Sequence, residues 1–178
     1  MRARSRLSIF ALLLLLTGSA ARADQTWNGQ WTDPHGVGLG IAAGANIPSN
    51  GNIDFKASPN WGFFVDIPLL DSFHITPSTL LYKLRDQNGN GSSATDVSLN
   101  FKFNIPLHRL DIFAGITAGI TSTVSIDPHV GVLSGVTFRL LPNLGLFAQL
   151  NYKYILRDEN VGGNISDFQI YAGPMFRF

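Results

Sequence analysis

The chain contains no cysteine among its 178 residues, which excludes disulfide bonds, thiolate metal ligands and a cysteine nucleophile. Charged residues are also scarce, at 14%, where soluble domains have roughly 25%. After residue 23, no segment approaches the ~18 consecutive apolar residues that a membrane-spanning helix needs. A membrane protein without such helices must satisfy its backbone hydrogen bonds as a closed barrel. The composition permits that architecture but does not establish it.

The first 23 residues have the features of a cleaved secretory signal peptide. Three arginines within residues 2–6 precede a short apolar core at 7–16, and Ala21–Ala23 offers a small-x-small cleavage site. The core is too short to anchor the chain across about 30 Å of hydrocarbon. Cleavage removes four of the 13 basic residues and none of the 12 acidic ones, so the net charge changes from +1 to −3. No nucleic-acid surface is therefore expected.

From residue 37 to residue 178, apolar residues alternate with polar or small ones over eight segments. A period of two indicates β-strands, because successive side chains point to opposite faces of a sheet. The segment 96–105, DVSLNFKFNI, alternates at every position. Residues 24–36 show no clean period and are interpreted as a periplasmic lead-in. The pattern predicts an all-β fold, an eight-stranded antiparallel up-and-down transmembrane β-barrel over residues 37–178.

The third segment, residues 73–85, is the least regular. Phe73 and Ile75 have one parity, whereas Leu80 and Tyr82 have the other. Pro77 lies between the two pairs and cannot donate a hydrogen bond to a strand ladder, so we expect a β-bulge there.

The connections between the segments alternate in length. Short turns at 68–72, 106–109 and 141–143 alternate with longer polar loops at 48–56, 86–94, 122–127 and 157–165. Short turns on one side and longer loops on the other are typical of transmembrane barrels. With an even number of strands, both termini of the barrel chain are expected on the short-turn, periplasmic side.

The inward face is expected to be filled rather than open, because eight strands enclose little more than side-chain volume. Ten inward positions are glycine, which leaves room for large residues: Phe64, Phe113, Leu133, Phe147, Tyr171 and Met175. Five inward charges near the periplasmic end predict a lumen ion-pair network: Asp66, Lys102, Asp111, Arg139 and Arg177. Such a network acts either as a plug that satisfies the interior, which we favour, or as an ion or proton gate.

Outward aromatic residues gather toward the two ends of the segments. We expect them to form girdles at the membrane interfaces; the set comprises Trp61, Phe73, Phe103, Phe138, Tyr152, Tyr154 and Phe168.

The last segment, residues 166–178, alternates up to a final aromatic residue. Tyr171, Phe176 and Phe178 resemble the C-terminal insertion signal of bacterial outer-membrane barrels. Together with the leader, the eight segments and the proline-marked turns, this ending is similar to the small eight-stranded barrels of the OmpA-type transmembrane domain and the opacity- and OmpX-like proteins. The resemblance implies a location in the outer membrane of a Gram-negative bacterium. It also implies contact with outer-membrane lipids, and with the barrel assembly machinery through the last strand.

Catalytic signals are weak. The four histidines are scattered without the spacing of metal ligands. The nearest approach to the His and Ser pair of a lipid A deacylase is His74-Ile75-Thr76, which has the wrong nucleophile. No catalytic, cofactor-binding or metal-binding residue is therefore predicted, and the chain is not expected to be an enzyme.

Three function classes follow. We favour a structural or surface-interaction barrel that presents its loops to an extracellular ligand. The alternatives are a narrow channel for ions or small solutes, and a lipid-modifying enzyme. A secreted ligand-binding barrel of lipocalin type is the rival fold, suggested by Gly29-Gln30-Trp31. Such a barrel would be apolar inside and polar outside.

Overall fold

The computed structural model describes residues 36–178 except 50–54, 87–90, 108, 124 and 158–162. The expected signal peptide and nearly all of the lead-in lie outside the described residues, as do parts of the long loops. Within the described part of the chain, no helix is long and apolar enough to cross a membrane.

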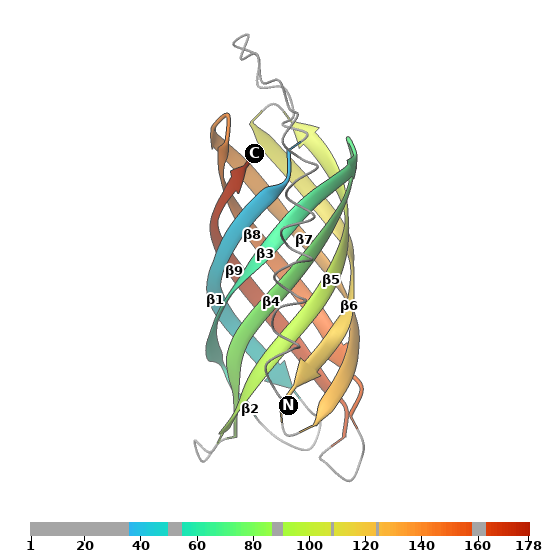
Figure 1. Ribbon diagram of the computed structural model, residues 1–178. Coiled ribbons are helices and arrows are strands. Elements are labelled where there is room, and N and C mark those ends of the chain that lie inside the picture. Colours follow the sequence, from blue (N-terminus) through green and yellow to red (C-terminus); the bar gives the residue numbers. More distant parts are fainter. Residues whose placement is uncertain (1–35, 50–54, 87–90, 108, 124, 158–162) are drawn as a thin grey trace, which may run out of the picture.

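The strands form a single closed antiparallel sheet (Figure 1). The order of the eight main strands is β4-β3-β1-β9-β8-β7-β6-β5. β4 also pairs with β5, which closes the barrel. The two-residue β2 pairs with the last two residues of β4. The strands are β1 Gly38–Ser49, β2 Phe55–Lys56, β3 Ser58–Leu70, β4 Phe73–Asp86, β5 Gly91–Leu107, β6 Leu110–Ser122, β7 Ile126–Leu141, β8 Leu144–Ile155 and β9 Ile165–Arg177. Apart from β2, each strand pairs with its neighbours in sequence, and β9 returns to β1. The predicted eight-stranded up-and-down barrel is confirmed.

The two ends of the barrel differ in their connections. The β3–β4, β5–β6 and β7–β8 turns are short and lie at the rim that also carries the C-terminus (Figure 1). We call this rim the short-turn end and the opposite rim the loop end. The predicted alternation of short and long connections is confirmed.

The bulge predicted at Pro77 is wrong. β4 pairs with β5 in one unbroken register, from Phe73 opposite Phe103 to Arg85 opposite Gly91. On its other side, the register shift lies between Pro68 and Leu70, at the turn. The prediction assumed that apolar residues in this segment face outward. In the structure, Leu80, Tyr82 and Leu84 are buried inside the barrel, so the parity never slips.

The two faces of the sheet have opposite character. The outer face exposes large apolar side chains at mid-strand, such as Ile41 (64% exposed), Ile116 (59%) and Val132 (57%). Polar and charged side chains predominate among the buried residues, including Asp96 and Lys153. This distribution is that of a barrel with a lipid-facing exterior. It is the reverse of a lipocalin-type barrel.

Inward glycines lie beside aromatic side chains of the neighbouring strand, in the small-against-large filling that the sequence predicts. A Cβ atom on Gly40 would lie 2.1 Å from the ring of Phe64, and one on Gly135 would lie 2.4 Å from the ring of Phe113. Both rings therefore lie directly against backbone that has no side chain. Phe64 also packs edge-on against Phe147, with ring centroids 4.6 Å apart.

Candidate functional site: the barrel lumen

At the short-turn end, Asp111 on β6 and Arg139 on β7 form a two-point ion pair. Arg139 Nε lies 3.1 Å from Asp111 Oδ2, and Arg139 Nη2 lies 2.6 Å from Asp111 Oδ1. Bidentate pairs of this geometry are among the stronger charge-assisted hydrogen bonds. Both side chains retain 7% exposure, so the pair lies just inside the mouth.

A second carboxylate at this end, Asp66 on β3, collects three partners. Its Oδ2 lies 2.9 Å from His74 Nδ1 and 3.1 Å from Arg177 Nη2, and its Oδ1 accepts a 2.7 Å hydrogen bond from Thr76. His74 and Thr76, the pair nearest to a deacylase signature, thus face the lumen and bind a carboxylate. Neither points to the lipid side of the wall.

Lys102, the last of the five predicted lumen charges, is in neither ion pair. Its Nζ atom lies 4.6 Å from the centroid of the Phe113 ring and 5.6 Å from that of Phe64. The structure thus places all five predicted charges in the same half of the lumen. Four of them form two ion pairs, whereas Lys102 contacts aromatic rings.

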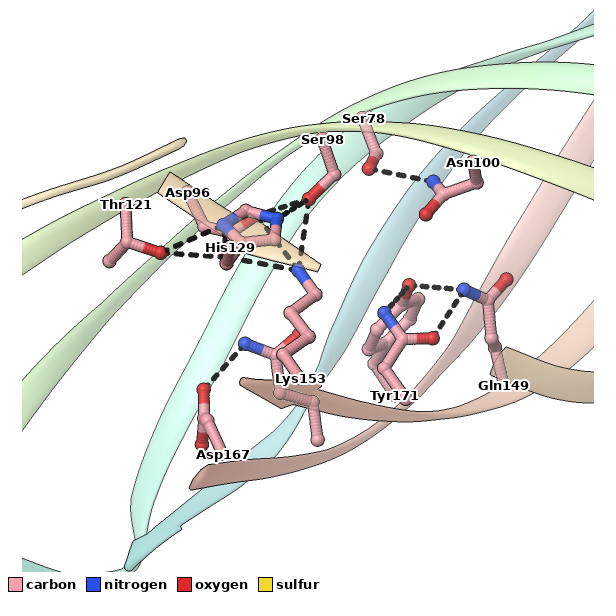
Figure 2. Close-up of polar contacts among 12 residues, drawn as sticks. Ser78, Asp96, Ser98, Asn100, Thr121, His129, Gln149, Lys153, Asp167 and Tyr171 are labelled. Atoms are coloured by element: carbon pink, nitrogen blue, oxygen red, sulfur yellow. Dashed lines mark hydrogen bonds and ion pairs between the residues drawn. The ribbon is translucent and has the colours of Figure 1, made fainter. Parts of the chain in front are cut away.

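The middle of the lumen is held by neutral polar groups. The hydroxyl of Tyr171 accepts hydrogen bonds from Gln149 (2.6 Å) and Asn151 (3.0 Å) (Figure 2). Asn100 donates to the carbonyl of Thr76 at 2.8 Å, across the β4–β5 pair. Tyr171, one of the three residues of the expected insertion signal, is thus packed inside the barrel and 4% exposed.

Toward the loop end, the lumen contains a second charged cluster that the sequence analysis missed. Lys153 Nζ on β8 lies 2.9 Å from each carboxylate oxygen of Asp96 on β5, and also 2.9 Å from Ser98 Oγ (Figure 2). Asp96 and Lys153 are both 0% exposed. The alternation of the strand could have identified Lys153 as a lumen residue, because it lies between the outward Tyr152 and Tyr154 and must therefore point inward.

His129 on β7 completes this cluster. Its Nε2 lies 3.1 Å from Ser98 Oγ, and its Nδ1 lies 3.2 Å from Thr121 Oγ1 and 3.8 Å from Asp96 Oδ2. Ser98, His129 and Asp96 are the residue types of a hydrolase triad. However, all three side chains are buried on the lumen side of the barrel. Val97, which lies between Asp96 and Ser98 on β5, faces outward. A lipid substrate at the outer face would meet Val97 and not the Ser98 hydroxyl.

The loop end of the lumen is closed by apolar side chains and an ion pair at the rim. The buried apolar residues at these strand ends are Tyr82, Leu84, Ala94, Ile155 and Ile165. Arg157 donates to Asp127 Oδ2 at 2.8 Å and to Thr123 Oγ1 at 2.7 Å, which ties the end of β8 to the β6–β7 connection.

Two small cavities lie within the packed lumen, each of about 10 Å³. A volume of this size holds about one water molecule. Phe64 and Lys102 line both cavities, so these two side chains lie between them. In the part of the chain that the structure describes, no group of three or more His, Cys, Asp or Glu side chains is placed to hold a metal ion.

Comparison with known proteins agrees with this architecture. No family model matches the chain, and no curated protein matches it. Neisserial surface protein A superposes with a TM-score of 0.70 at 16% identity, covering 80% of this chain and 97% of that one. The attachment invasion locus protein Ail of Yersinia pestis gives 0.54 at 12% identity over 80% and 99%. The outer membrane protein OprG from Pseudomonas aeruginosa gives 0.52 at 9% identity over 84% and 99%.

The chain has the fold of the small eight-stranded outer-membrane barrels. At these identities the likeness shows the fold alone, and it confirms the architectural part of the resemblance drawn from the sequence.

The aromatic residues expected at the membrane interfaces lie on the outer face of this barrel. Phe73 is half-buried. The exposed fractions of the other six are Trp61 61%, Phe103 58%, Phe138 43%, Tyr152 50%, Tyr154 40% and Phe168 39%. Phe176 (51%) and Phe178 (63%) of the expected insertion signal also point outward. Their roles as girdle and signal stay predictions.

Proposed function

We propose that the protein is an integral barrel of the bacterial outer membrane with a structural or surface-interaction role and no catalytic activity. The observation that carries this proposal is the inverted distribution of side chains around a filled lumen. The exterior presents apolar residues to lipid, and the interior is occupied from mouth to mouth by ion pairs, aromatic rings and hydrogen-bonded amides. A lumen packed in this way supports a structural or surface-interaction barrel better than a channel.

The partners in this proposal follow from the same surfaces. Outer-membrane lipids cover the apolar belt, and β9, with Phe176 and Phe178 pointing outward, is the strand offered to the barrel assembly machinery. An extracellular ligand would bind at the four loops of the loop end. Ail, which shares the fold, is named for attachment and invasion, and a comparable surface role is part of the proposal here.

The first experiment is membrane fractionation combined with conductance in planar bilayers. We expect the protein in the outer-membrane fraction, and no current steps above baseline from the purified barrel. A wide-bore porin inserted into the same bilayers shows that they report a pore. Recovery of the protein in the soluble fraction without detergent would contradict the membrane assignment.

A narrow channel is the second candidate, and it is favoured by buried polar atoms that have no hydrogen-bond partner among the described residues. These include Asn60 Oδ1, Asn100 Oδ1, Thr117 Oγ1 and Gln169 Oε1. Buried polar groups are almost always hydrogen-bonded to protein or ordered water. A thread of water molecules along these atoms would give small solutes or ions a route. Steady current steps that change in Lys102→Ala or Arg139→Ala would favour the channel over the filled barrel.

For a lipid-modifying activity, the decisive comparison is the mass spectrum of lipid A from cells with and without the protein. We expect identical spectra, because the Ser98 and His129 side chains are buried on the lumen side of the barrel, away from the lipid.

A further inference from the structure

The outer face of the barrel carries two exposed lysines near the loop end, Lys56 on β2 and Lys83 on β4 (Figure 1). Tyr82 and Leu84, on either side of Lys83, are buried in the lumen, so the Lys83 side chain points away from the barrel. Lys56 pairs with position 85 of β4, two residues beyond Lys83. The two lysines are therefore diagonal neighbours on the outer face, about 7–8 Å apart, within reach of one ligand.

The remainder of the loop-end exterior is different in character. The large residues exposed near the loop end on other strands are apolar or aromatic, and include Ile47, Ile126, Tyr154 and Phe168. Among the charged side chains that the structure describes, four are exposed. Asp71 and Arg109 lie at the short-turn end, and Lys56 and Lys83 lie at the loop end. Within that described set, the exposed charge of the loop end is positive and is confined to β2 and β4.

The surface beside the two lysines continues into the apolar belt. Trp61 on β3 is 61% exposed and pairs with Leu81, two residues before Lys83 on β4. Two residues of a strand span about 7 Å, so Lys83 lies about that much nearer the loop end than Leu81 does. Ser93 on β5 pairs with Lys83 and is also exposed. Interfacial tryptophans lie at the level of lipid headgroups, and lysines on an apolar surface extend their ammonium groups toward the polar layer. This sector therefore offers a cationic edge directly above an aromatic and apolar surface.

We propose that Lys56 and Lys83, with the hydroxyl of Ser93, bind a phosphate group of a lipid A molecule in the outer leaflet, whose acyl chains lie along Trp61 and Leu81. This inference rests on the proposed location in the outer membrane, with the loop end facing outward. Ammonium and hydroxyl groups donate to phosphate oxygens, and charge-assisted hydrogen bonds of this kind are among the stronger ones. A lipid fits better than a soluble phosphate, because a soluble phosphate would leave the adjoining apolar surface without a contact.

The test is native mass spectrometry of the detergent-solubilised protein titrated with lipid A, and with the same lipid A after removal of its phosphates. We expect the wild-type protein to bind the phosphorylated lipid more tightly. Lys83→Gln should weaken that binding about fivefold, which is the contribution of one lysine beside an anionic lipid surface, and should leave binding of the dephosphorylated lipid unchanged. Arg109→Gln is the matched control, because it removes one exposed positive charge at the opposite end of the barrel, and it should bind lipid A as the wild type does.

The double variant Lys56→Gln with Lys83→Gln separates a two-lysine site from a single surface charge. It should bind lipid A about 25-fold more weakly than the wild type, because each lysine contributes about fivefold. A double variant that binds as well as Lys83→Gln would contradict the site. Equal weakening in Lys83→Gln and Arg109→Gln would show an effect of net charge alone and overturn the proposal, as would equal binding of the two lipids by the wild type. Either result in a protein that fractionates with the outer membrane would refute the lipid site and leave the proposed function standing.

Discussion

The Asp96–Lys153 pair gives the sharpest prediction of stability. Lys153 makes all three of its ammonium hydrogen bonds to Asp96 and Ser98, and neither charged side chain is exposed. Lys153→Met leaves the carboxylate without its cation, and Asp96→Val leaves the ammonium with one acceptor, Ser98. Removing one partner of a buried ion pair costs about 3–5 kcal/mol, so each single variant should lose that much free energy of unfolding.

The double variant, Asp96→Val with Lys153→Met, should recover most of this loss. Replacing both charges with apolar groups of similar size is often neutral or stabilising. Some loss remains, because the hydroxyls of Ser98 and Thr121 lose the carboxylate that accepts from them. His129 still contacts both hydroxyls, but an imidazole has at most one acceptor nitrogen, so at least one hydroxyl loses its acceptor, at a cost of about 1–3 kcal/mol.

The assay is reversible urea unfolding in lipid vesicles, followed by tryptophan fluorescence. Trp61 on the outer face is 61% exposed, so its emission reports removal from lipid. Asp111 and Arg139 at the short-turn mouth serve as the comparison pair, where water reaches the side chains and the single variants should cost less. Single losses below about 1 kcal/mol that add in the double variant would show that Asp96 and Lys153 are hydrated and screened, and would refute the reasoning.

Two further predictions test the packing and the orientation of the wall. Gly40→Val should destabilise the barrel by about 1–3 kcal/mol through overpacking against Phe64. Adding Phe64→Leu should restore part of this loss in the same urea assay. An unchanged urea midpoint in Gly40→Val would contradict the close packing of Gly40 against Phe64. Ile116→Arg, at mid-strand on the outer face, should cost about 2–4 kcal/mol in vesicles, whereas Ile126→Arg at the loop end should cost about 0–1 kcal/mol. Equal costs at the two positions would place the bilayer elsewhere.

The outcome at β4 shows where pattern reading fails. The bulge predicted at Pro77 would place Leu80 and Tyr82 on the same face as Phe73 and Ile75, because all four residues are apolar or aromatic. The lumen of a narrow barrel is not uniformly polar, since apolar side chains close its loop end. Residue character therefore identified the face wherever glycine or charge alternated with apolar residues, and misled where both faces were apolar.

The sequence by itself determined the number of strands, their alternation, the short and long connections, and the inward position of the five charges near the short-turn end. These are local properties, because a period of two assigns a side chain to a face within a few residues. Only the tertiary structure decided which charges meet. Asp96 and Lys153 are 57 residues apart and lie on β5 and β8, which are not adjacent in the sheet. Their contact across the lumen depends on the registers of all the strand pairs between them in the closed barrel. The position of Lys102 away from a carboxylate depends on the same registers. No single segment of the sequence determines this arrangement.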